Sequence, residues 1–469
     1  MNFRKAPLAI ILSMLAMPVS INHAFANQDT STTQSVPAEP DSAAQSAQDV
    51  QVAEIDPDQQ VQELIDNYRQ AVEAKVRAQG KQNSVVFFEG KGQIAVDKNH
   101  TDWSEFRALA LNEAVLKARE SYLKTLNRDF VQQDIKEYFK AKGLPEPTAD
   151  DFKSESKLTQ LLNKAIAVVD SKLNAELEEN GVNPQEFEAA PQTKKQQLFR
   201  EYIGTKSITR AYGDLSGMFV VKTFEVIEDN GKGTVGVVMA LSNAKRDRVK
   251  ALVESRGNVM PDPAKANPAN ANIKSKLANM NDTLFLNTGT QLWYDDKGYP
   301  MLVSFGQAGV IYTNDPDERT MEREAARGYA EDNAWGLLAG TYNMNGNFAR
   351  DSMRGQEKTK DKVFEFASGN VRTSETAGIQ RKIMSVTEES SKMTSSIRDV
   401  TGVGVEHTWL KKHPVTGKEM TGVVVVWHPV RIQNAEDLQN GREPVTTETN
   451  KPTSAHEAGS EDFFDAADF

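Results

Sequence analysis

The chain has no cysteine. Disulfides, thiolate nucleophiles, cysteine-based zinc or iron–sulfur sites and lipid attachment to a cysteine are therefore all excluded. Apolar residues are also scarce, at 39% of 469 residues, whereas charged residues reach an ordinary 26%. This balance excludes a multi-span membrane protein and a wholly disordered chain, and it predicts two to four folded domains separated by polar stretches.

Excess positive charge is lacking too, because the formal net charge is −11. An acidic chain is poorly suited to binding nucleic acid or an anionic membrane surface. We therefore expect no nucleic-acid partner, and we expect no transmembrane span in the mature chain.

The N-terminus has the pattern of a secretory signal peptide. Arg4 and Lys5 precede an apolar run from Ala6 to Ala16, and Ala24 and Ala26 are the small residues expected before a cleavage site. We predict cleavage of residues 1–26, so that Asn27 begins the mature chain and the net charge changes from −11 to −13. This pattern favours export to a bacterial periplasm, although an extracellular location remains open.

Composition shifts predict how the mature chain is organised. A flexible linker at 27–56 is followed by a first α+β module at 57–256, and a Pro- and Asn-rich linker at 257–283 leads to a second module at 284–433. The remaining residues, 434–469, are expected to form an acidic, disordered tail.

In the first module, an extended segment with Gly90 and Gly92 precedes a helix from about Asp102 in which alanine recurs every four residues. Small residues on one stripe let a helix lie close against a sheet. The expected elements that follow are an αα-hairpin insertion at 128–180, made of helices at 128–142 and 151–180, and strands at 208–212, 218–227 and 234–241.

The same order of features recurs in the second half of the chain. An offset of 216 residues places Gly90 on Gly306 and Arg107 on Arg323, and it places Ala110, Ala114 and Ala118 on Ala326, Ala330 and Ala334. An offset of 185 aligns the hairpin segment starting at Asp214 with the one starting at Asp399. We therefore predict an α+β fold of two related modules, each a small antiparallel sheet packed by an alanine-rich helix.

No pattern of catalytic, cofactor-binding or metal-binding residues stands out. His407, His413 and His428 lie within 22 residues of one another, but a hairpin would place them at different distances from its turn, so we assign no metal. The Gly90-Lys-Gly92 segment lacks the third glycine of a dinucleotide fingerprint, so we assign no cofactor. No nucleophile elbow, P-loop or other catalytic set is present, and no catalytic residue is assigned.

The tail carries the strongest candidates for binding a protein partner. Phe463, Phe464 and Phe469 lie among Glu461, Asp462, Asp465 and Asp468 in the last nine residues. Aromatic anchors in an acidic segment suit a basic, apolar groove on a partner, and the alternative is that the tail folds back on its own domain.

Two segments resemble a known family. Phe88-Glu-Gly90-Lys-Gly92-Gln and the Arg107-Ala-Leu-Ala110 helix, with Ala114 and Ala118, are similar to the opening of the fold shared by the flagellar outer-membrane ring assembly protein and small outer-membrane lipoproteins. The likeness covers about 40 residues per copy. The chain departs from the lipoproteins in lacking cysteine, and from both kinds of protein in its long helical insertion. The resemblance implies an envelope scaffold or assembly factor and transfers no catalytic residue.

From the sequence we therefore expect an exported, non-enzymatic envelope protein that binds other proteins in the cell envelope, with the oligomeric state left open. Two alternatives remain at this point. One is a periplasmic enzyme or ligand-binding protein with a site between the two modules, where interfaces between domains often form clefts. The other is a secreted adhesin or filament subunit.

Overall fold

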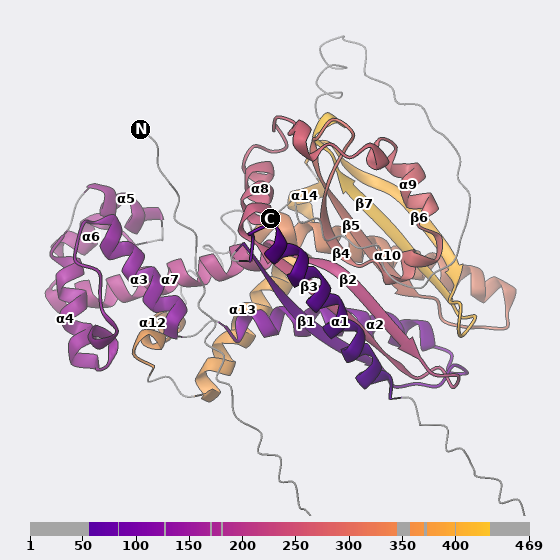
Figure 1. Cartoon of the computed structure of the whole chain (residues 1–469), viewed down its shortest axis with the longest axis horizontal. Coiled ribbons are helices and arrows are strands. Elements are labelled where there is room, and N and C mark those ends of the chain that lie inside the picture. Colours follow the sequence, from indigo (N-terminus) through magenta and orange to yellow (C-terminus); the bar gives the residue numbers. More distant parts are fainter. Residues whose placement is uncertain are drawn as a thin grey trace, which may run out of the picture. The chain divides into compact units, whose positions relative to one another are not determined.

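A computed structural model describes residues 56–82, 84–125, 128–168, 171–179, 182–344, 357–369, 373–398 and 400–431. Helices and antiparallel strands are mixed along the chain, which confirms the expected α+β class (Figure 1). The helices are α1 (Pro57–Ala78), α2 (Trp103–Leu123), α3 (Arg128–Ala141), α4 (Glu155–Ile166), α5 (Ser171–Glu179), α6 (Pro184–Ala189), α7 (Gln192–Ser216), α8 (Asn243–Glu254), α9 (Ile273–Asn279), α10 (Pro316–Met344), α12 (Glu357–Glu365), α13 (Thr373–Lys392) and α14 (Ser395–Arg398). The strands are β1 (Val85–Ile94), β2 (Met218–Ile227), β3 (Gly233–Ser242), β4 (Gly289–Tyr294), β5 (Pro300–Gly309), β6 (Val403–Lys412) and β7 (Glu419–Trp427).

The first sheet has the antiparallel order β1-β3-β2 and is covered on both faces. Helix α1 packs Val61, Ile65, Val72 and Val76 against one face, and α2 packs its alanine stripe against the other. A Cβ added to Gly90 would lie 2.1 Å from the carbonyl oxygen of Ala114, and one added to Gly92 would lie 1.9 Å from that of Ala110. The glycines and alanines therefore bring helix and sheet into backbone contact, as their spacing predicts.

The second sheet repeats this packing. Its antiparallel order is β4-β5-β7-β6, and α10 lies over β4, β5 and β7 with Ala326, Ala330 and Ala334 buried. A Cβ on Gly306 would lie 2.2 Å from the carbonyl oxygen of Ala330, which matches the contact between Gly90 and Ala114. Helix α9 and the short 3₁₀ helix η4 (Asn281–Leu286) pack on the opposite face.

The two modules also share their hairpin irregularity. The pairing of β2 with β3 shifts register between Val220 and Lys222, and the pairing of β6 with β7 shifts between Val405 and His407. These positions are related by the same offset of 185 residues that the sequence indicates. The modules therefore have the same strand, helix and bulged-hairpin order.

The insertion in the first module is larger than a two-helix hairpin. Helices α3 to α7 occupy 128–216, and the stretch expected as one helix at 151–180 is divided between the 3₁₀ helix η1 (Ala149–Phe152), α4 and α5. The strand predicted at 208–212 is wrong, because these residues lie inside α7. Ile208, Ala211, Tyr212 and Leu215 are all buried there at helical spacing, and this packing outweighs their local β-propensity.

Helices from the second module complete this part of the fold. Residues of α12 and α13, including Val363, Phe364 and Ile383, share one apolar core with α3, α4 and α7. We call this assembly of 128–216 and 357–392 the helical arm (Figure 1).

The segment between the modules, 257–283, holds short helices. The 3₁₀ helices η2 (Pro263–Lys265) and η3 (Pro268–Asn270) are capped by Asp262 and Asn267, and α9 follows them. The predicted signal peptide and the acidic tail lie outside the described residues. Among the helices that the structure describes, none combines the length and apolarity needed to cross a lipid bilayer.

Candidate functional site

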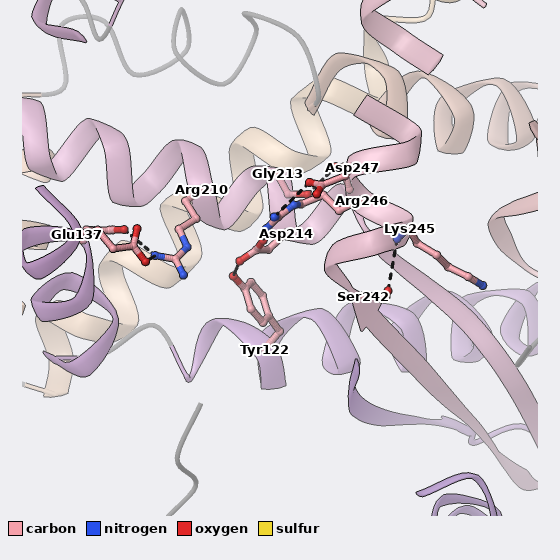
Figure 2. A network of polar contacts seen from close by, with 11 residues as sticks. Tyr122, Glu137, Arg210, Gly213, Asp214, Ser242, Lys245, Arg246 and Asp247 are labelled. Carbon is pink, nitrogen blue, oxygen red and sulfur yellow. Dashed lines mark hydrogen bonds and ion pairs between the residues drawn. The ribbon is translucent and has the colours of Figure 1, made fainter. Parts of the chain in front are cut away.

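A first buried polar network lies where the helical arm meets the first sheet (Figure 2). Asp214, near the end of α7, accepts a hydrogen bond of 2.7 Å from the hydroxyl of Tyr122 on α2, and its other carboxylate oxygen pairs with Arg246 of α8. Burial raises the pKa of Tyr122, and the charge of Asp214 raises it further, so the phenol remains a donor. One carboxylate therefore connects three helices.

Further polar contacts lie along α7, deeper in the arm. Ser207 and Arg210 each donate a 2.6 Å hydrogen bond to the carboxylate of Asp134 on α3. Burial raises the pKa of Asp134, and the hydrogen bonds and the charge of Arg210 oppose that rise. Ser207, Arg210 and Asp214 are three and four residues apart, so α7 presents them along one side. Figure 2 shows Arg210 and Asp214 on this helix.

A second network joins the two modules. The Arg107 guanidinium on α2 is fully buried, and each of its nitrogens donates to a different segment. Nε bonds Glu225 Oε2 on β2, Nη1 bonds Gln307 Oε1 on β5, and Nη2 bonds the carbonyl oxygen of Phe285 in η4, each at 2.7 Å. One side chain thus connects its own module to two segments of the other.

His413, in the turn after β6, completes this second network. Its Nδ1 accepts a hydrogen bond from the Val415 N–H at 3.3 Å, so Nε2 carries the proton and donates to Glu225 Oε1 at 2.7 Å. The imidazole packs between the rings of Trp103 and Phe285, with centroid distances of 5.0 and 5.6 Å. The second module therefore inserts an aromatic, hydrogen-bonding side chain into the first.

Glu225 is ionised despite having only 11% of its side chain exposed. Burial raises the pKa of Glu225, but the charge of Arg107 and the hydrogen bond from His413 outweigh that effect and lower it to about 2. The Arg107, Glu225, His413 and Gln307 side chains, which we call the joint, are matched in charge and in hydrogen bonds. This arrangement holds segments of the two modules together.

The three histidines singled out by the sequence occupy three different environments. His413 lies in the joint, and His428 lies 3.4 Å from Asp295 Oδ2. His407 is partly buried on β6, where burial and then the charge of Lys411 lower its pKa. Within the described ranges, no group of three or more His, Asp or Glu side chains is placed to hold a metal ion.

The other residues singled out by the sequence lie outside the described part of the chain. These are Ala24, Ala26 and Asn27 at the predicted cleavage site and Phe463, Phe464 and Phe469 in the tail. No pattern in the sequence marks Glu225 or Asp214 as structural residues, whereas His413 is expected there to be a turn histidine and not a metal ligand. Arg107 is the one residue of these networks that a sequence pattern marks, because it recurs as Arg323 in the second copy.

A hollow of about 630 Å³ opens on the arm rather than beside the joint. It is lined mainly by polar side chains of α5 and α6, including Asn174, Glu178 and Glu188. The hollow is a depression in a polar surface, and no titratable group of either network lines it.

Comparison with known proteins locates part of the first network in a recognised sequence unit. A family model described as a domain of unknown function, DUF6844, matches residues 158–254, which include Ser207, Arg210, Asp214 and Arg246. No curated protein matches the chain. Among solved structures, the chain is similar to a hypothetical protein, FTT1539c, from Francisella tularensis, with 17% identity, a TM-score of 0.41 and coverage of 82% of this chain and 93% of that one.

Proposed function

We propose that the protein is an exported, non-enzymatic scaffold or assembly factor that binds other proteins in the bacterial cell envelope. The observation that carries this proposal is that the buried charged side chains connect separate elements of the chain. Arg107, Glu225, Asp134 and Asp214 are each engaged in connecting separate elements of the chain. The N-terminal signal pattern and the resemblance to envelope proteins also support it.

Elements connected by buried charge pairs in this way suit a role in which several surfaces must keep a fixed geometry. Removing one partner from a buried charge pair is costly, so such pairs hold the connected segments in one arrangement. On this proposal, the phenylalanines of the acidic tail supply the contact with the partner.

Export and partner capture can be tested in the organism that makes the protein. Cell fractionation should recover it outside the cytoplasm with Asn27 as its first residue by N-terminal sequencing. Crosslinking in intact cells followed by affinity purification should then recover a defined envelope protein. An uncleaved Met1 on cytoplasmic protein would contradict export.

The tail is tested in the same purification. Changing Phe463, Phe464 and Phe469 to Ala should remove the partner while leaving the thermal midpoint nearly unchanged, because binding by an ordering segment depends on its aromatic anchors. Retention of the partner by this variant would place the binding surface elsewhere on the chain.

A further inference from the structure

Among the residues that the structure describes, none covers one face of β6, whereas the rest of its sheet is covered. Val405, Thr408, Leu410 and Lys412 pair with Val425, Val423, Thr421 and Glu419 of β7, on the side of the sheet where α10 packs. Helix α10 covers β7 but not these four residues, and Val405 and Leu410 are 40% and 46% exposed. We call this surface the β6 shelf.

The first module shows what the same surface does when it is covered. The offset of 185 residues relates Val405, Thr408 and Leu410 to Val220, Thr223 and Glu225 of β2, and Val220 and Thr223 are completely or almost completely buried. There η4 and the turn after β6 pack on β2, bringing the Phe285 ring, its carbonyl oxygen and His413 to Arg107 and Glu225. The equivalent surface is therefore a docking face for an aromatic-bearing segment of chain.

The β6 shelf differs from that surface in its charge. Leu410 stands where β2 has Glu225, so the shelf offers no carboxylate at that position. Arg323, the equivalent of Arg107, reaches Glu419 instead, at 2.6 and 2.7 Å. Arg327 lies one helical turn further along the same side of α10 and is exposed, and Lys412 is exposed on the strand. The shelf is thus apolar at its centre and has the exposed cation of Lys412 at one end, which suits an incoming segment that supplies both aromatic rings and carboxylates.

We propose that the β6 shelf binds the C-terminal segment 461–469 of this same chain. In that segment, Glu461 and Asp462 precede Phe463 and Phe464. Asp465 and Asp468 lie between Phe464 and Phe469. The described chain ends at Arg431, just after β7, and the 29 residues from 432 to 460 can span up to roughly 95 Å, far beyond the length of a ten-residue strand. A second copy of β6 is a poorer occupant, because Lys411 and Lys412 would bring like charges together at the edge and the bulge near Val405 bends the strand.

This inference goes beyond the proposed function, which concerns what the tail binds on another protein. A tail held on the shelf is shielded until a partner with a better basic, apolar groove displaces it. The shelf then sets how readily the protein engages its partner.

Hydrogen exchange measured by mass spectrometry on the full mature chain tests the contact. Amides of 461–469 should be protected in the wild type, and the combined Leu410→Ser and Lys412→Glu variant should exchange them at least about tenfold faster. The matched control is Leu116→Ser with Lys117→Glu, an exposed apolar and basic pair on α2, which should leave the tail protected. Equal tail exchange in all three proteins would overturn the proposal.

A synthetic peptide of residues 461–469 tests whether the contact is made within one chain. Full-length protein carrying Ala at Phe463, Phe464 and Phe469 should bind the fluorescent peptide at least about tenfold more tightly than wild type, whose own tail occupies the shelf. Equal binding by both, or tail protection that appears only with dimer formation in sedimentation, would overturn it. If the shelf variant leaves tail exchange unchanged while the partner is still captured through the phenylalanines, this inference fails and the proposed function stands.

Discussion

Glu225 is held between two side chains that come from distant parts of the chain. Its carboxylate faces Arg107 on one oxygen and His413 on the other, and Arg107 in turn reaches Gln307 and Phe285. Burying a charge is unfavourable unless its partners satisfy it, and replacing a buried pair with apolar residues can even stabilise a protein. We therefore interpret the joint as a set of contacts that determines which segments of the two modules pack together.

The low pKa of Glu225 gives stability a defined pH dependence. Because the folded-state pKa of about 2 lies below the ordinary value of 4.5, the stabilisation is fully present above pH 4.5 and is lost as the pH falls toward 2. This shift corresponds to about 3 kcal/mol. In Glu225→Gln, urea unfolding should show a smaller loss of stability between pH 4.5 and 2.5 than in wild type.

Exposed Glu105→Gln is the matched control for that measurement, since this side chain has no part in the joint. It should keep the wild-type dependence of unfolding free energy on pH. Identical pH profiles for the Glu225 variant and wild type would mean that Glu225 is not held ionised by Arg107.

At this scale the sequence predicts little of the joint. The hydrogen bond between His413 and Glu225 joins residues 188 positions apart, and the one between Arg107 and Gln307 spans 200. Local spacing carries no information about such pairs. From the sequence, His413 is expected to be a turn histidine rather than a metal ligand, but its partner Glu225 is not indicated, and Arg107 stands out only as half of a repeated pair.

At the scale of elements, local spacing is far more informative. The glycine strand and the alanine helix were predicted in both modules because one helical stripe and one strand face are short-range patterns. The strand at 208–212 was mispredicted because Ile208 and Thr209 favour strands locally, whereas Ile208, Ala211 and Leu215 fit a buried helix face equally well. The division of 151–180 into several helices has no comparably clear sequence signal.

The repeated glycine–alanine contact gives a paired prediction. Gly90→Ala and Gly306→Ala each place a Cβ 2.1–2.2 Å from a helix carbonyl oxygen, so α2 or α10 must move from its sheet. Each change should destabilise the protein by at least about 2 kcal/mol in chemical denaturation. Ala114→Leu and Ala330→Leu should act in the same direction, by about 1–3 kcal/mol.

Gly328→Ala provides the control within α10. A Cβ there meets nothing within 4 Å, so the change should be neutral or slightly stabilising. If the Gly306 and Gly328 variants had the same stability, the close contact between α10 and β5 would be disproved.

At the scale of the whole molecule, the two modules share the helical arm. Helix α12 belongs to the second module in sequence, yet it packs on α7 of the first, with the backbone of Lys360 directly over Gly204. A Cβ on Gly204 would lie 2.2 Å from the Lys360 carbonyl oxygen. The arm is therefore a second connection between the modules, far from the joint in sequence.

A substitution that pushes α12 away from α7 should increase amide exchange in α12 and leave the two sheets unchanged. In Gly204→Ala, amides of 357–365 should exchange faster by at least about tenfold, while those of β3 and β7 keep their protection. Gly213→Ala, on the same helix with nothing within 4 Å of the added Cβ, should leave α12 unchanged. Uniformly faster exchange across both sheets would instead show that the arm and the sheets unfold together.

The joint also has a consequence for the order in which the protein can be completed during synthesis. Arg107 and Glu225 are made early, but three of the groups that satisfy them, at Phe285, Gln307 and His413, follow later in the chain. A nascent chain ending before η4 therefore leaves Arg107 and Glu225 open to water, because its first sheet lacks the cover that η4 and the turn after β6 supply. The first half to leave the ribosome cannot reach its final form until nearly the last strand has been made, and contacts this distant in sequence make folding slow.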